Sequence, residues 1–276
     1  MLDKMTYTNH MNEKIVFGES PYFANYSNLR DFKWEYTKAN NKILSFEKGI
    51  GERKLPVTIM CNTEEEGNQK KNALYEIMEK DVLAMQYGTL EIGQYKMQCY
   101  IKESAKSEFL YDKKYMKVDL VIVTDRPYWV KEKTFVFGQS NQQGGDETAF
   151  LDFDIEYAYD YTNSMESMNI VNNNFVASNF RLAIYGEALN PRISVNGHVY
   201  EVSGTVEAGQ NLVIDSIEKT ITLNTKNGAK VNKFNERNRD SYIFEKIPAG
   251  DLVLARSDNF RFDLTLIEER GEPKWT

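Results

Sequence analysis

The 276-residue chain contains 41% hydrophobic and 27% charged residues, a composition that excludes a wholly disordered or collagen-like protein. Its formal charge of −7, from 34 basic and 41 acidic residues, argues against a general nucleic-acid-binding protein, because such proteins present a basic surface. Two cysteines and two histidines leave little material for a metal site or a nucleophile, so the composition points away from common enzyme classes.

The first half of the chain predicts several strands. Phe32, Trp34 and Tyr36 alternate with charged residues, which is typical of a strand with one buried face. Apolar residues at strand spacing predict further strands over 55–61, 95–101 and 115–123. The basic residues around Tyr115 are diluted by nearby acidic ones, so we interpret this patch as a solvated strand end.

One convincing helix is predicted between these strands. Thr63 and Glu66 have the spacing of a capping box, which marks a helix start. Apolar residues then recur every three or four positions and predict a single apolar stripe, formed by Leu74, Ile77, Met78, Val82 and Met85. The first half is therefore predicted to be an α+β arrangement, with a sheet covered by one helix.

A domain boundary is predicted near the middle of the chain. Residues 138–145 contain no apolar side chain, so they suit a linker. We expect a first domain over 1–137, a linker over 138–149 and a second domain over 150–276. The charge differs across the boundary: residues 1–137 carry 21 − 20 = +1 and residues 138–276 carry 13 − 21 = −8. Two such different surfaces are expected to face different neighbours.

The second half is predicted to be all-β. Asn196-Gly197 lies between two apolar runs and predicts a hairpin with a type I′ turn. A second hairpin is expected around 215–219. Alternating apolar residues predict the remaining strands, over 151–157, 180–184 and 260–266. Short strands at such intervals are typical of a sandwich or jelly roll.

A run of carboxylates is the most enzyme-like cluster of the sequence. Asp152, Asp154 and Glu156 would share one face of a strand, with Asp160 close behind. Such a row could bind calcium or serve a glycan hydrolase. The alternative, which we favour, is a solvated face whose opposite side is buried.

Tyrosines on the same stretch suggest a binding module. Tyr157, Tyr159 and Tyr161 recur at every second position, so they could form a stacking platform for sugar rings in a lectin-like domain. One buried sheet face explains the pattern equally simply, and we favour it. His10 and His198 stand isolated in the sequence and are expected at the surface or in turns.

The two cysteines and the lengths of the apolar runs indicate the cellular compartment of the chain. Cys61 and Cys99 could form a disulfide, but a lone pair is more often two reduced core thiols. The first residues lack the apolar core of a signal peptide, and the longest apolar stretches, such as 120–123, are strand-sized. We therefore expect a chain made in a cytoplasm, without classical export or a membrane span.

Taken in order, four stretches of the sequence resemble the distal tail proteins of siphophages, the long-tailed bacteriophages. These are Ala73–Met78 with Leu83–Tyr87 and Tyr95–Ile101; Thr124–Trp129; Asn190–Gly197; and Ile247–Gly250 with Phe262–Leu266 and Glu269–Trp275. The resemblance spans nearly the whole chain. It implies a mainly-β protein: a tail-tube-like β-sandwich or barrel with one flanking helix, followed by a jelly-roll or galectin-like sandwich.

The family resemblance also implies a function by assembly. Members form a ring, typically a hexamer, that joins the tail tube to the baseplate or host-recognition apparatus. The implied partners are further copies of the chain, the tube protein, and a tail-associated lysin or receptor-binding proteins, with a host saccharide as a further candidate. The implied location is the virion tail tip, after assembly in the bacterial cytoplasm.

Catalysis is not implied by the resemblance, and neither is a metal, a cofactor or a catalytic residue. The sequence departs from larger family members because its second domain has no long insertion, so a sugar-binding module of its own is not implied.

Overall fold

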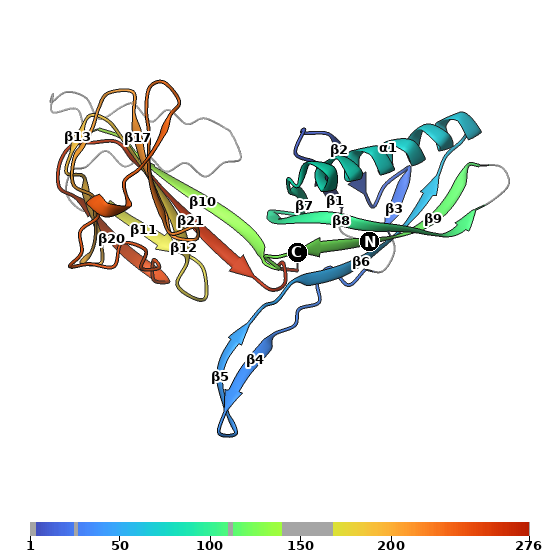
Figure 1. Ribbon diagram of the computed structural model, residues 1–276, viewed down its shortest axis with the longest axis horizontal. Helices are drawn as coiled ribbons and strands as arrows, with labels where there is room; N and C mark the ends of the chain where they lie inside the picture. The colour runs from blue at the N-terminus through green and yellow to red at the C-terminus, as the bar shows by residue number, and fades with distance from the viewer. Residues whose placement is uncertain (1–3, 25–26, 110–112, 140–167, 276) are drawn as a thin grey trace. The chain divides into compact units, whose positions relative to one another are not determined.

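The computed structural model describes residues 4–24, 27–109, 113–139 and 168–275. The chain forms two compact units, shown in Figure 1. Unit 1 comprises Met1–Lys131 with Glu269–Thr276, and unit 2 comprises Glu132–Glu268. The division falls within two strands and returns the C-terminal residues to unit 1, whereas the sequence predicted domains over 1–137 and 150–276.

Unit 1 contains two antiparallel sheets that share one long strand. The strand orders are β2-β1-β7-β8 and β3-β6-β9-β8. The strands are β1 (Met5–Thr8), β2 (Lys14–Phe17), β3 (Tyr22–Ala24), β6 (Gly51–Met60), β7 (Gly88–Ile92), β8 (Tyr95–Phe109) and β9 (Tyr115–Thr124). The first part of β8 pairs with β7 and the remainder pairs with β9, so β8 connects the two sheets.

The alternation predicted for β8 is confirmed. Tyr95, Met97 and Cys99 are buried on one face, while Lys96 and Gln98 between them are exposed. Successive side chains of a strand point to opposite faces, so this pattern commits one face of β8 to the core. The strands predicted over 55–61 and 115–123 are also present, as β6 and β9.

Helix α1 (Glu64–Ala84) lies over the sheets of unit 1 (Figure 1). The predicted capping box is present: Thr63 Oγ1 accepts from Glu66 N at 3.1 Å. Leu74 and Met78 are buried as predicted, and Ile77 packs partly buried against the same core. The predicted stripe is wrong at its C-terminal end, where Val82 and Met85 are exposed.

Asp81 occupies the place on the stripe that was assigned to Val82. It lies seven residues after Leu74 and three after Met78, so helical geometry turns it toward the core. Met85 has already left the helix, because its left-handed backbone (φ 51°) ends it. The hydrophobic pattern failed here because a buried carboxylate interrupts the stripe.

Unit 2 contains two principal sheets. Their strand orders are β19-β18-β17-β12-β21-β10 and β11-β20-β14-β15, and β13 pairs separately with β16. The bounds are β10 (Trp129–Phe137), β11 (Met168–Asn172), β12 (Asn179–Tyr185), β13 (Ala188–Leu189), β14 (Arg192–Val195), β15 (His198–Glu201), β16 (Thr205–Val206), β17 (Asn211–Asp215), β18 (Thr220–Asn224), β19 (Lys230–Asn232), β20 (Gly250–Arg256) and β21 (Phe262–Arg270). A short 3-10 helix, η1, covers Phe234–Glu236.

Both predicted hairpins of unit 2 are confirmed. The β14–β15 turn places Asn196 (φ 48°) and Gly197 (φ 86°) in positive φ, as a type I′ turn requires. The β17–β18 hairpin turns after Asp215, whose Oδ1 accepts from Ile217 N at 2.9 Å and from Glu218 N at 3.0 Å. These local turns fix the register of the strands on either side.

Each unit has its own apolar core. In unit 2, Phe137 stacks on Phe262 with ring centroids 4.5 Å apart, and Phe180 meets Tyr200 edge-on at 5.0 Å. In unit 1, Trp129 is fully buried and its Nε1 donates to Leu29 O at 3.2 Å. The described chain is therefore mainly β, with α1 as its α-helix, in agreement with the predicted fold class.

Candidate functional site

An exposed hairpin is the most unusual surface of unit 1. Strands β4 (Glu35–Ala39) and β5 (Lys42–Glu47) pair only with each other, and the hairpin extends away from the sheets on the side away from α1 (Figure 1). Every residue from 31 to 44 is exposed. A two-stranded hairpin without a third strand or a covering helix is at best marginally stable in water.

The hairpin has one apolar and one polar face near its middle. Tyr36 and Phe46 are cross-strand partners whose rings meet edge-on at 6.4 Å. On the opposite face Thr37 Oγ1 and Ser45 Oγ form a hydrogen bond of 2.7 Å. The strand with one buried face predicted over 32–36 is therefore wrong for the chain alone. The residues alternate as expected, but nothing in the described chain covers the apolar face.

The apolar exposure of the hairpin is large for a soluble surface. Its exposed apolar side chains, together with those just beyond its ends, are Phe32, Trp34, Tyr36, Ile43, Leu44, Phe46 and Ile50. Leu44 is 67% exposed although it would gain about 1.5–3 kcal/mol from full burial. Contiguous exposed apolar patches of this kind mark interaction sites.

The base of the hairpin is anchored. Lys48 Nζ donates to Pro127 O at 3.2 Å and lies 4.3 Å from the ring centroid of Tyr128 and 5.0 Å from that of Trp34. Burial, and after it the charge of Arg53, lower the pKa of Lys48 to about 8. The hairpin is thus held in place at its base and uncovered along the rest of its length.

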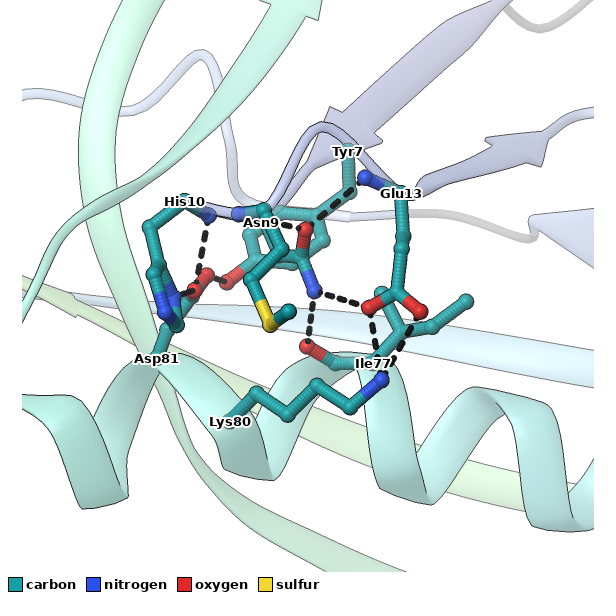
Figure 2. A network of polar contacts seen from close by, with 8 residues as sticks. Tyr7, Asn9, His10, Glu13, Ile77, Lys80 and Asp81 are labelled. Carbon is teal, nitrogen blue, oxygen red and sulfur yellow. Dashed lines mark hydrogen bonds and ion pairs between the residues drawn. The ribbon is translucent and has the colours of Figure 1, made fainter.

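A second candidate is the polar network under the β1–β2 turn, shown in Figure 2. Asp81 is fully buried, and its Oδ2 accepts from Tyr7 Oη at 2.5 Å. Its Oδ1 accepts from His10 N at 2.9 Å and lies 2.5 Å from His10 Nδ1. His10 was expected to be isolated. It lies in a turn as predicted, but it is paired, and only the fold brings it to a helix more than seventy residues away.

The same turn is held by a second set of contacts. Asn9 Nδ2 donates to Glu13 Oε2 at 2.7 Å and to Ile77 O at 3.2 Å. Lys80 Nζ donates to both oxygens of Glu13 at 2.8 Å. Hydrogen bonds from Lys80 and Asn9 lower the pKa of the half-buried Glu13.

The chemistry of the network is structural. Burial, followed by the hydrogen bond to Asp81, raises the pKa of Tyr7 far above its ordinary value, so the phenol stays neutral. A neutral buried phenol and a fully hydrogen-bonded carboxylate connect β1 to α1. Asp81 could have been found from the sequence, because it is a charged residue on the apolar stripe of a helix.

We expect the raised Tyr7 pKa to make unit 1 less stable at alkaline pH. The folded protein retains this proton while the unfolded chain releases it above pH 10.0, the ordinary tyrosine pKa, so rising pH favours the unfolded state. Urea unfolding from pH 8 to 11 should show wild type losing about 1.4 kcal/mol per pH unit more than Tyr7→Phe above pH 10. Equal slopes for the two proteins would contradict a raised pKa of Tyr7. Below pH 10, the difference between their free energies of unfolding should stay constant.

The remaining predicted residues are not brought together as a site. Cys61 and Cys99 are both free, as favoured, and burial raises the pKa of Cys99 to about 12, which makes it an unreactive thiol. His198 lies beside the β14–β15 turn, with Nε2 3.0 Å from Tyr242 O. No group of carboxylates, histidines and cysteines in the described residues could hold a metal ion.

The carboxylate row and the tyrosine row fall outside the described residues. This applies to Asp152, Asp154, Glu156 and Asp160, to Tyr157, Tyr159 and Tyr161, and to nearly all of the predicted linker. Within the part of the chain that the structure describes, α1 is too polar to span a membrane, and no other helix is long enough.

The fold resembles that of solved phage hub and baseplate proteins. A crystal structure of SPP1 Dit (gp 19.1), described as a paradigm of the hub adsorption apparatus in phages that infect Gram-positive bacteria, matches with a TM-score of 0.62 and 9% identity. The match covers 98% of this chain and 100% of that one. The fold expected from the family resemblance is thereby confirmed.

Two further structures show the same likeness. Chains of the phage P2 baseplate in its activated conformation, one with Ca and one with Sr, each match with a TM-score of 0.57 and 13% identity. Each match covers 99% of this chain and 100% of the other. No family model matches the sequence, and no curated protein matches it. The similarity is thus one of fold, extending over both units.

Proposed function

We propose that this chain is a distal tail protein of a phage or prophage, which forms a ring at the tail tip and joins the tail tube to the baseplate or host-recognition apparatus. The observation that carries the proposal is the likeness to SPP1 Dit along nearly the entire chain, including both units. A likeness that covers both units is more specific than a likeness in one sandwich alone.

The uncovered hairpin supports a function by assembly. The apolar face of the hairpin would be buried in an oligomer. Burial by a neighbouring subunit would explain why the sequence alternates like a half-buried strand although the apolar side chains are exposed in the single chain. The protein acts as a scaffold without turnover, as a homo-oligomeric ring, most simply a hexamer. The ring contacts the tube protein on one side and a tail-associated lysin or receptor-binding proteins on the other.

Negative-stain electron microscopy of the purified full-length chain tests the proposal. We expect closed rings with a central channel, and sedimentation of the same sample should give the mass of a small whole number of copies. A protein that stays monomeric at all concentrations, alone and when mixed with its tube protein, would overturn the proposal. Class averages give the ring symmetry directly and thereby test the hexamer.

A further inference from the structure

The amine of Lys48 has unusual surroundings for a lysine, all of them within unit 1. Its Nζ donates to Pro127 O at 3.2 Å and lies 4.3 Å and 5.0 Å from the ring centroids of Tyr128 and Trp34. The backbone of Gly271 packs against the same amine, because a Cβ atom there would lie 2.8 Å from Lys48 Nζ. The side chain is half-buried. Lys48 is therefore held in one position, next to aromatic rings and partly removed from water.

A second cation lies close to Lys48. Arg53 is buried on β6, where its Nη1 donates to Asp31 O and its Nε has no hydrogen-bond partner among the described residues. The charge of Arg53 disfavours the ammonium form of Lys48, and the carboxylate of Glu269 offsets this only in part. Burial and Arg53 together hold the pKa of Lys48 at about 8, compared with an ordinary value of 10.5.

These surroundings make Lys48 a nucleophile near neutral pH. A lysine becomes one when it is desolvated or lies beside another cation, because only the neutral amine carries a free electron pair. At pH 7.5 about a quarter of Lys48 would be neutral, compared with about 0.1% of an amine of ordinary pKa. A less basic nucleophile is intrinsically less reactive, which reduces this advantage by about tenfold. An advantage of roughly one order of magnitude remains.

We propose that Lys48 is a preferred site of acylation on this chain and takes an acyl group from an activated donor, an acyl phosphate. The neutral amine attacks the carbonyl carbon of the donor, so that a C–N bond forms and the bond from that carbon to the phosphate oxygen breaks. Phosphate leaves, and the proton displaced from nitrogen passes to solvent. This property goes beyond the proposed assembly function and does not depend on it.

Acylation would change the anchor at the base of the hairpin. The amide product is neutral, so the attraction between the ammonium and the rings of Tyr128 and Trp34 is lost. One N–H remains on Nζ and can still donate to Pro127 O. The modification therefore removes a charge from the hairpin base and preserves its hydrogen bond.

Competitive labelling of the full-length chain tests the proposal. The folded protein is treated with a trace of acetyl phosphate at a series of pH values from 6.5 to 10, then unfolded and fully acetylated with deuterated acetic anhydride. Mass spectrometry of its peptides gives the ratio of light to heavy acetyl groups, and hence the relative rate, at each lysine. We expect Lys48 to react about tenfold faster than exposed lysines at pH 7.5. Its rate should level off above about pH 8, while theirs continue to rise.

Lys219 provides a matched control in the same chain. Its Nζ also lies near two rings, 5.5 Å from Tyr242 and 5.4 Å from Phe244, and donates to Phe244 O at 3.5 Å. Lys219 is exposed, so accessibility alone would make it react faster than the half-buried Lys48. The proposal is overturned if Lys48 reacts no faster than Lys219 at pH 7.5, or if the two rates rise in parallel up to pH 10.

Two substitutions that neutralise nearby charges should act in opposite directions. Arg53→Gln should slow acylation of Lys48 about threefold at pH 7.5, and Glu269→Gln should accelerate it about twofold, with Lys219 as the internal reference. Circular dichroism verifies that each variant is folded. If Arg53→Gln does not fold, Glu269→Gln and the pH profile of the wild type decide the outcome. An unchanged rate at Lys48 in folded Glu269→Gln protein would contradict the electrostatic origin of its reactivity and overturn the proposal.

Discussion

Shortening the β4–β5 hairpin should abolish ring formation and leave both units folded. Replacing residues 35–47 with Asn-Gly keeps Trp34 and Lys48 adjacent and closes them with a two-residue turn. The removed residues include the exposed apolar side chains of Tyr36, Ile43, Leu44 and Phe46 but none of the core of unit 1. The free energy of unfolding should therefore change by no more than about 0.5 kcal/mol, while sedimentation should show a monomer.

Point variants separate the loss of contact from the loss of the hairpin. Ile43→Ser with Leu44→Ser keeps the strands but removes the apolar tip, and it should also yield monomers. Thr37→Ala with Ser45→Ala alters the polar face and should preserve the rings, because that pair satisfies itself by a hydrogen bond. A shortened chain that assembles into the same rings as wild type would refute the assembly role of the hairpin.

Asp81→Ala should lower the free energy of unfolding of unit 1 by about 3 kcal/mol. The substitution leaves the hydroxyl of Tyr7, a fully buried side chain, without its acceptor and frees the backbone N–H of His10. A buried donor deprived of its partner costs about 1–3 kcal/mol, and more where a charged group is involved. Urea unfolding, followed by near-ultraviolet circular dichroism, measures the change.

A matched carboxylate on the same helix provides the control. Glu76→Ala removes an exposed side chain and should change the stability by less than about 0.5 kcal/mol. Asp81→Asn keeps one acceptor oxygen for Tyr7 and should fall between the two. An Asp81→Ala protein as stable as the Glu76→Ala protein would show that the network of Figure 2 contributes nothing to folding.

Local patterns predicted the strands β6, β8, β9, β12 and β21 and both hairpins of unit 2, but they missed other strands, among them β1, β7, β10 and β20. The run from Phe262 to Leu266 alternates along β21, and Asn196-Gly197 closes its hairpin, because both depend on residues a few positions apart. The family resemblance rested on such short landmarks, and their order along the chain led to the correct fold. The order of these stretches along the chain constrains the topology of the fold more than any single stretch does.

Two features that the sequence analysis did not predict, the contacts of Asp81 and the exposure of the hairpin, share a physical cause. Each depends on residues that are distant in the sequence or belong to another molecule. The charge on the apolar stripe marks Asp81 in the sequence, but its partners Tyr7 and His10 lie more than seventy residues earlier in the chain, so local patterns do not reveal them. The alternation around Tyr36 predicted a buried face, but nothing in the described residues covers that face. A hydrophobic pattern indicates that one face of a strand is suited to burial, but it does not indicate which molecule buries that face.

The return of residues 269–275 to unit 1 has a consequence for synthesis. Gly271 lies against Phe32 and Lys48 at the hairpin base, and Arg30 Nη1 donates to Pro273 O at 2.8 Å. A ribosome makes these residues only after the whole of unit 2. The hairpin base is therefore completed late, so a nascent chain acquires its full docking geometry only once its second unit has emerged. We therefore expect association of copies to begin only after synthesis of the chain is complete.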